Sequence, residues 1–184
     1  MPEDQVLSNP AIPAALRQFV TEQLASERVR YLRSAPMISA DHTRGEWLNS
    51  AERSNWYYWT TLREHLLMTD WSSAAVSGLD EETDRILAQL GNPAEPEFDI
   101  RGLVLGYVQS GKTANFTALI AKAVDVGYRL VIVLSGLDKG LRKQTQVRLK
   151  RELVGYSDNR SGAVPFPPMG KHWHEFTSED LEGD

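Results

Sequence analysis

We expect the fold of this chain to be set by residues 102–113, which read Gly102-Leu103-Val104-Leu105-Gly106-Tyr107-Val108-Gln109-Ser110-Gly111-Lys112-Thr113. Residues 100–105 include a short apolar run that is typical of a buried parallel strand, and the run leads directly into Gly106. From Gly106 to Thr113 the residues fit G-x-x-x-x-G-K-[ST] at every constrained position, between a predicted strand and a predicted helix. This pattern predicts a phosphate-binding loop, with a chance glycine-rich turn as the alternative.

Each residue type in the loop has a physical reason. Two glycines permit close approaches that a Cβ would block, so successive N–H groups can point at phosphate oxygens. A helix predicted from Lys112 to about residue 126 adds the positive end of its dipole. The Lys112 ammonium is predicted to reach the β- and γ-phosphates of ATP as the catalytic cation, and the Thr113 hydroxyl to ligate Mg²⁺. The predicted nucleotide contacts are Gly106, Gln109, Ser110, Gly111, Lys112, Thr113 and Ala114.

A second apolar run, residues 130–134, reads Leu-Val-Ile-Val-Leu and is rich enough in β-branched residues to predict a central parallel strand. A further helix is predicted after it, capped by Asp138 or Ser135 and continuing to Leu153. The predicted fold class is therefore α/β. A helical N-terminal region precedes the first part, β–P-loop–α–β–α, of a RecA-like parallel-sheet P-loop NTPase core.

A cluster of glycine and prolines near Pro93 marks the predicted boundary between two regions. We expect a helical region over residues 1–96, a partial P-loop NTPase domain over 97–155, and a loop with an acidic tail over 156–184. In the first region, helical spacing predicts helices over about 13–31 and 50–68, and a third that is capped by Asp80 and stopped by Gly91. Its aromatic residues indicate a helical core, or alternatively a stacking surface for bases: Trp47, Trp56, Tyr57, Tyr58, Trp59 and Trp71.

The helix predicted from Asp138 to Leu153 is locally basic. Between Asp138 and Glu152 there are six lysines and arginines against two acidic residues. Arg142, Lys143 and Gln144 lie in its first turns, where amides and side chains could hold a phosphate of DNA. The alternative is a solvated helix face.

Composition limits the classes of function. The whole chain has 20 basic and 25 acidic residues, a net charge of -5, so any nucleic-acid contact must come from a local patch. It contains no cysteine, which excludes disulfides and thiolate metal sites, and it has no apolar run of membrane-spanning length. A cytoplasmic location is expected. His172, His174 and Glu175 could suggest a zinc site, but a polar tail is the preferred interpretation.

The segment from Gly102 to Phe116, with residues 127–136 and 141–146, resembles the opening of the bacterial Z-one-domain family of endonucleases. These large proteins contain a superfamily-two helicase-like ATPase region and are associated with defence against foreign DNA such as that of phage. The resemblance covers residues 97–155. It implies a nucleic-acid-dependent ATPase in which Gly106 to Thr113 is motif I and Ser135 to Gln144 occupies the place of motif Ia, along a strand of DNA.

This sequence departs from that pattern after Leu153. An ATPase of this type needs a carboxylate pair at the end of another apolar strand, and no run of four apolar residues follows Leu153. We therefore expect a fragment, with the carboxylates and the second lobe supplied by the remainder of a larger protein or by a partner subunit. A non-hydrolysing nucleotide-binding or interaction module and a P-loop small-molecule kinase are the other candidate functions.

Overall fold

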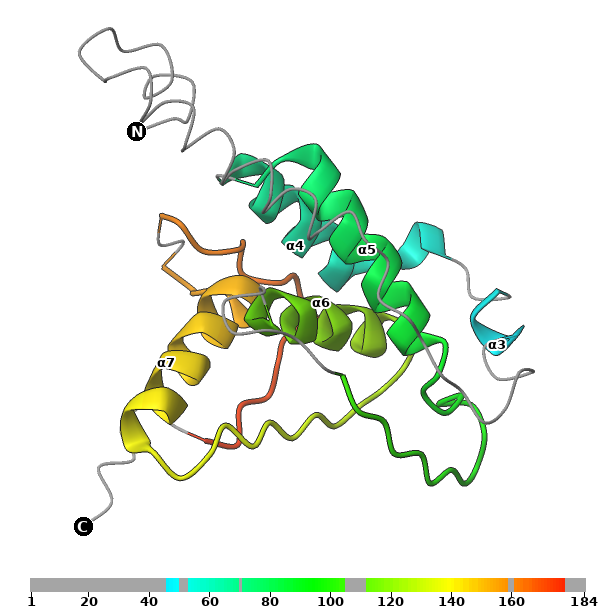
Figure 1. The fold of residues 1–184 in the computed structure, drawn as a ribbon. Coiled ribbons are helices and arrows are strands. Elements are labelled where there is room, and N and C mark those ends of the chain that lie inside the picture. The colour runs from blue at the N-terminus through cyan, green and yellow to red at the C-terminus, as the bar shows by residue number, and fades with distance from the viewer. Residues whose placement is uncertain (1–45, 50–52, 70, 105–111, 159–160, 178–184) are drawn as a thin grey trace, which may run out of the picture.

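The described part of the chain is helical (Figure 1). The computed structural model describes residues 46–49, 53–69, 71–104, 112–158 and 161–177. Within these ranges the elements are α3 (Glu46–Asn49), the 3₁₀ turn η1 (Arg53–Asn55), α4 (Tyr57–Met68), α5 (Ser73–Leu87), α6 (Lys112–Asp125), α7 (Lys139–Leu149) and the π-helical turn η2 (Lys150–Val154). The helix predicted over residues 13–31 lies outside the described residues.

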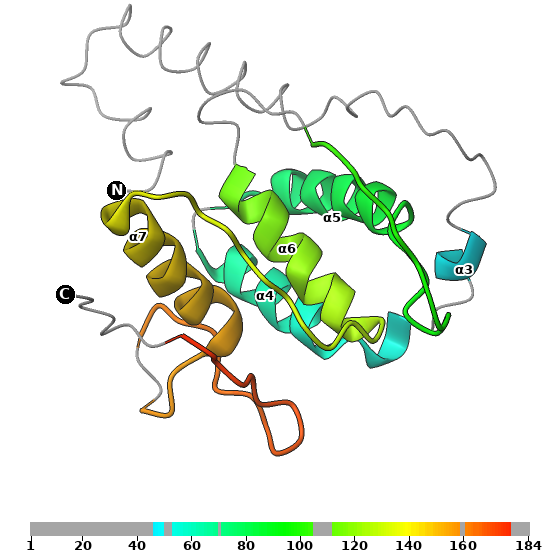
Figure 2. The same ribbon diagram turned by 90° about the horizontal axis from the view of Figure 1, so that it is seen from below.

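The core lies where α6 packs against both α4 and α5, as the two views show (Figures 1 and 2). The buried face of α6 is built from small side chains, including Ala114, Ala118 and Ala121, which let the three helices approach closely. Larger residues of α4 and α5 fill the space opposite this face. The buried ones are Trp59, Leu62, Leu66, Val76, Leu79 and Leu87.

The aromatic residues of the front half belong mainly to this core. Trp56 and Trp59 are buried, and Trp47 and Trp71 are partly buried and packed against the same cluster. The Trp47 indole N–H also donates to the carbonyl of Leu90 at 3.2 Å. The helical-core interpretation is therefore confirmed for these tryptophans.

The predicted α/β fold class is wrong for the described residues, since none of them forms a strand or a sheet. Residues 100–104 and 130–134 carry no regular structure, and in Figure 1 the second segment runs beneath α6 on its way to α7. Their apolar side chains are largely exposed, with Leu103 at 82%, Ile132 at 73% and Leu134 at 90%. No parallel-sheet P-loop core is therefore present in the described part.

The physical reason is that a strand is stable only with partners. Two short apolar segments offer too little pairing to form a sheet, because a two-stranded unit is marginal in water. The helices instead bury their apolar faces on one another. One face of α6 is buried only in part: Ala123 is buried, whereas Phe116, Leu119 and Ile120 are partly buried.

Local helix signals are confirmed more often than the strands. The helix predicted from Lys112 ends at Asp125, and Gly127, with φ 114°, follows it as predicted. Asp138 caps α7 by accepting a hydrogen bond from the Leu141 N–H at 2.7 Å. The cap predicted for α5 is wrong: Ser72 caps it, and Asp80 lies within the helix.

Asp125, at the end of α6, caps the beginning of α4 across the bundle. Its carboxylate accepts backbone N–H bonds from Tyr57 at 2.8 Å, Tyr58 at 3.0 Å and Trp59 at 2.8 Å. These N–H groups are among the four that a helix leaves unpaired at its start. Burial raises the pKa of Asp125, while the three backbone hydrogen bonds act in the opposite direction.

We expect Asp125→Ala to lower the free energy of unfolding by about 2 kcal/mol, because three partly buried N–H groups lose their acceptor. Urea denaturation followed by far-UV circular dichroism measures this loss. Asp99→Ala is the control, since the Asp99 carboxylate is exposed and its ion pair within the described residues is with Arg101 at the surface. Equal unfolding midpoints for the two variants would contradict the capping role.

The exposed apolar segment 130–134 should make the chain self-associate, because an unpaired, β-branched, uncharged run is a template for intermolecular pairing. We expect Ile132→Lys to raise the concentration at which the protein remains monomeric, with the unfolding free energy changed by less than about 0.5 kcal/mol. Light scattering over a concentration series measures this. Ser77→Lys adds the same charge on the exposed surface of α5 and should leave self-association unchanged.

Candidate functional site

The predicted phosphate loop meets the described structure at the first turn of α6. Residues 105–111, which include Gly106, Gln109, Ser110 and Gly111, lie outside the described residues, and so does the side chain of Lys112. Their roles stay predictions. The α6 helix begins at Lys112, so the last two residues of the motif occupy a helix N-terminus.

Within this first turn, Thr113 is partly buried and its carbonyl accepts a hydrogen bond from the Thr117 hydroxyl at 2.7 Å. The methyl group of Ala114 is buried in the helical core, which leaves the backbone N–H as the group that could contact a phosphate. The first turn of α6 contains no acidic side chain. The positive end of the helix dipole is therefore not neutralised by an acidic side chain of the same turn.

Lys122, two turns further along α6, anchors the helix to α5. Its side chain is 0% exposed, and its ammonium group donates to the carboxylate and the carbonyl of Asp80 and, at 2.7 Å, to the carboxylate of Asp84. The ammonium also lies 4.4 Å from the centroid of the Trp59 ring. Asp84 in turn pairs with Arg53 through its second oxygen. The buried ion pairs of Lys122 therefore hold α6, the helix that begins in the motif, against α5.

The sequence analysis missed this network, although two signals were present. Lys122 is the one charged residue among the buried residues of α6 in the described part of the chain. Asp80 and Asp84 are four residues apart and therefore lie on the same face of α5. A buried lysine needs an acidic partner, and two aspartates on one face of a neighbouring helix could provide that partner.

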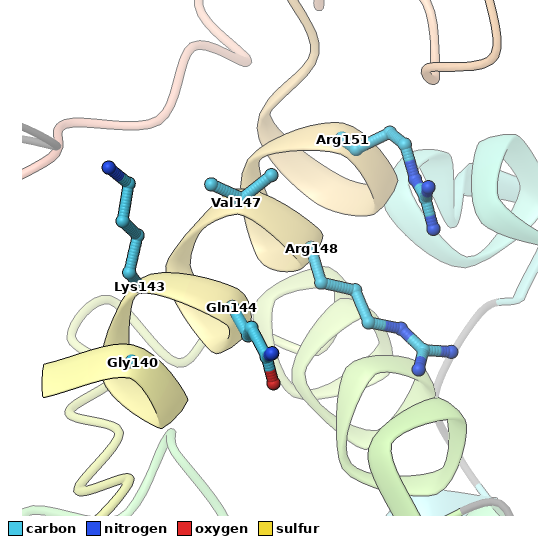
Figure 3. Close-up of a pocket in the computed structure, with 6 residues that line it drawn as sticks. All are labelled: Gly140, Lys143, Gln144, Val147, Arg148 and Arg151. Carbon is cyan, nitrogen blue, oxygen red and sulfur yellow. The ribbon is translucent and has the colours of Figure 1, made fainter. Parts of the chain in front are cut away.

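On α7, the predicted nucleic-acid residues divide between two faces. Arg142, Lys143 and Gln144 are all exposed. Lys143 and Gln144 line a shallow groove of about 410 Å³, together with Gly140, Val147, Arg148 and Arg151 (Figure 3). The groove contains no acidic residue in its lining. Arg142 is not among the residues that line it.

Arg142 instead lines a more enclosed cavity of about 570 Å³. Its walls come from α6, the 130–135 segment, α7 with η2, and residues 173–177. Most of the wall is apolar, including Ile120, Val131, Leu149 and Leu153. The predicted strand therefore places part of its side chains over this cavity rather than in a sheet.

The histidines near the C-terminal end do not form a metal site in the structure. The ring of His172 packs on Phe166, that of His174 on Phe176, and Glu175 pairs with Lys150 at 3.3 Å. Among the residues whose structure is described, no group of three or more His, Cys, Asp or Glu side chains could hold a metal ion. None of the helices in the described ranges is long and apolar enough to cross a membrane.

The described residues define a small helical bundle, in which one central helix begins in a phosphate-loop motif and another carries a basic groove. Comparison with protein-family models, curated proteins and solved structures finds no match to this chain.

Proposed function

We propose that this chain binds a nucleoside triphosphate, ATP with Mg²⁺, through residues Gly106 to Thr113, as the nucleotide-binding segment of a helicase-like, nucleic-acid-dependent ATPase. The observation that carries the proposal is the complete eight-residue motif running into a helix that begins at its lysine. Glycine-rich backbone and a helix N-terminus together favour bound phosphate. Lys112 would neutralise the phosphates and Thr113 would ligate Mg²⁺.

The arrangement of α6 supports this role, because a phosphate site depends on a helix that does not shift. Lys122 ties the helix to α5, and Asp125 ties its end to α4. Both anchors lie beyond the first turns of α6 and leave its N-terminal end to contact a ligand. Preorganised N–H groups contribute more to anion binding than groups that must first be ordered.

The test is a titration of the full chain with a fluorescent ATP analogue, with Mg²⁺ and then with excess EDTA. Saturable binding that weakens when Mg²⁺ is removed supports the proposal. No binding in either condition overturns it. Stimulation of ATP hydrolysis by oligonucleotide would support the nucleic-acid-dependent ATPase in particular.

A second candidate is a module that binds nucleotide without hydrolysing it. The observation that favours it is that residues 154–184 contain no run of four apolar residues that could place a catalytic carboxylate pair at its end. Binding of the analogue with no phosphate release, with or without DNA, would select this candidate. Transfer of phosphate to a small acceptor would instead indicate a kinase.

A further inference from the structure

The carboxyl end of α7 carries a feature that nucleotide binding does not use. There the α-helix passes into the π-helical turn η2, which closes with a hydrogen bond from the Gly155 N–H to the Lys150 carbonyl at 2.8 Å. Single π turns inside helices occur frequently at functional sites. This one changes the direction of the side chains that follow Leu149.

The loop after the turn holds it in this conformation. Gly155 has φ 73°, and a Cβ there would lie 2.8 Å from the Pro165 carbonyl oxygen and 2.9 Å from that of Val164. The Val164 N–H donates to the Arg151 carbonyl at 2.8 Å. Only glycine fits this close approach, so the loop and the turn form one unit.

Glu152 lies inside this turn and holds two arginines. Its side chain is 5% exposed, and its Oε1 accepts hydrogen bonds from Arg148 Nε at 2.9 Å and from Arg151 at 3.0 Å. Its Oε2 is buried and has no hydrogen-bond partner among the described residues. A buried carboxylate that is only half satisfied is costly, and an apolar side chain of similar size would pack as well or better. Stability alone therefore does not account for a glutamate here.

What Glu152 does achieve is to fix two guanidinium groups beside the groove of α7. Figure 3 shows Arg148 and Arg151 extending to the same side of the helix. Each guanidinium has five N–H donors and uses few of them on Glu152, so donors remain for an oxyanion. One carboxylate offsets only one of the two charges. Lys143, on the same groove, makes no ion pair with any described residue and adds another positive charge.

We propose that this groove holds the phosphodiester backbone of a nucleic-acid strand, with Arg148 and Arg151 as the phosphate-binding pair and Glu152 as their positioning residue. The inference rests on the nucleic-acid dependence proposed above and moves its main contact from the first turns of α7 to the last. Charge complementarity selects the occupant, since the groove is lined by three cationic residues and no acidic one, on a chain of net charge -5. From Lys143 to Arg151 the helix rises about 12 Å, which spans several nucleotides of a strand.

The first test measures fluorescence anisotropy of a labelled single-stranded oligothymidylate, and of a labelled duplex, with the full chain. We expect Arg148→Ala/Arg151→Ala to weaken binding about tenfold or more at low salt and to lower the salt-dependence slope by about two. The matched control is Arg63→Ala/Arg129→Ala, which removes the same charge from exposed positions away from the groove. Equal weakening by both double variants would overturn the proposal, as would binding of a phosphopeptide but of neither oligonucleotide.

The second test separates positioning from charge. Glu152→Met removes a negative charge, so simple electrostatics predicts tighter binding of the oligonucleotide. Positioning predicts the opposite: we expect binding at least about threefold weaker, because the two arginines lose their common acceptor. Tighter binding by this variant would refute the positioning role. Should it fail to fold, Glu152→Gln keeps the acceptor oxygen and should retain wild-type affinity or exceed it, and a fall in its affinity counts against the proposal.

Nucleotide titrations of the same variants separate the two proposals. The Arg148→Ala/Arg151→Ala variant should bind the ATP analogue as the parent chain does. The two arginines lie at the carboxyl end of α7 and in η2, outside the predicted phosphate loop. If the variant loses oligonucleotide binding and retains ATP binding, the lost binding is assigned to the groove and not to the nucleotide site. If the parent chain binds the oligonucleotide but not ATP, the proposed nucleotide site is overturned and the proposed role of the groove remains.

Discussion

The Asp80→Asn/Asp84→Asn variant should lose about 3 kcal/mol of unfolding free energy, the largest stability effect that the structure predicts. Both substitutions keep the shape of the side chains and remove the two charges that face Lys122. The lysine is then left fully buried without a counter-charge, with the Asp80 carbonyl, the Trp59 ring and two neutral amide oxygens around it. An uncompensated buried charge is among the few changes that cost this much.

Chemical denaturation of the full chain measures the loss. Glu81→Gln/Glu82→Gln is the matched control, because it removes two charges from the same helix at positions without an ion pair to any described residue. We expect it to change the unfolding free energy by less than about 0.5 kcal/mol. If the two double variants lose the same amount, the buried network does not stabilise the bundle.

Adding Lys122→Met to the Asp80→Asn/Asp84→Asn variant should restore most of the stability. Methionine fills the space of the lysine stem and brings no charge, and buried ion pairs are commonly replaceable by apolar residues at little cost. This recovery would show that the unfolding free energy was lost because the buried ammonium group had no counter-charge. If the triple variant is no more stable than the double variant, the asparagine substitutions destabilise the chain by changing the structure of α5 instead.

The second large effect concerns the ligand. Lys112→Ala should weaken binding of the ATP analogue about 100-fold, since a charge-assisted contact with phosphate is worth about 1.5–3 kcal/mol and each 1.4 kcal/mol is a factor of ten. The fold should be unaffected, because Lys112 is the first residue of α6 and the buried face begins at Ala114. Circular dichroism checks this.

Arg129→Ala is the control for Lys112→Ala. It removes a cation that is exposed and that follows the other end of the same helix. We expect the affinity for the ATP analogue to stay within about twofold of the parent, because solvent and salt screen an exposed charge beyond about 10 Å. Equal affinities for the Lys112→Ala and parent chains would rule out a phosphate loop at this position.

The helices that carry the candidate sites could be predicted from the sequence, because their signals are local. The start of α6 at Lys112, its end before Gly127 and the Asp138 cap of α7 depend on residues within a turn of each other. The groove itself was not predicted. Two of the predicted nucleic-acid residues, Lys143 and Gln144, line it, while the third, Arg142, lines the neighbouring cavity.

The strands were predicted wrongly because an apolar run indicates burial without saying against what. Residues 130–134 would suit the centre of a sheet, but a sheet needs several strands in register, and the described residues provide none. The same run instead contributes residues 130–133 to the wall of a cavity, and Ile132 remains 73% exposed there.

By itself, the sequence determined the phosphate-loop motif, the helix that starts in it and the positive charge of α7. Only the tertiary structure decided that Lys122 would be buried on Asp84, 38 residues away, and that Asp125 would cap a helix 68 residues away. Helix capping and periodicity arise from neighbouring residues, whereas the burial of a charge depends on which distant segments pack around it.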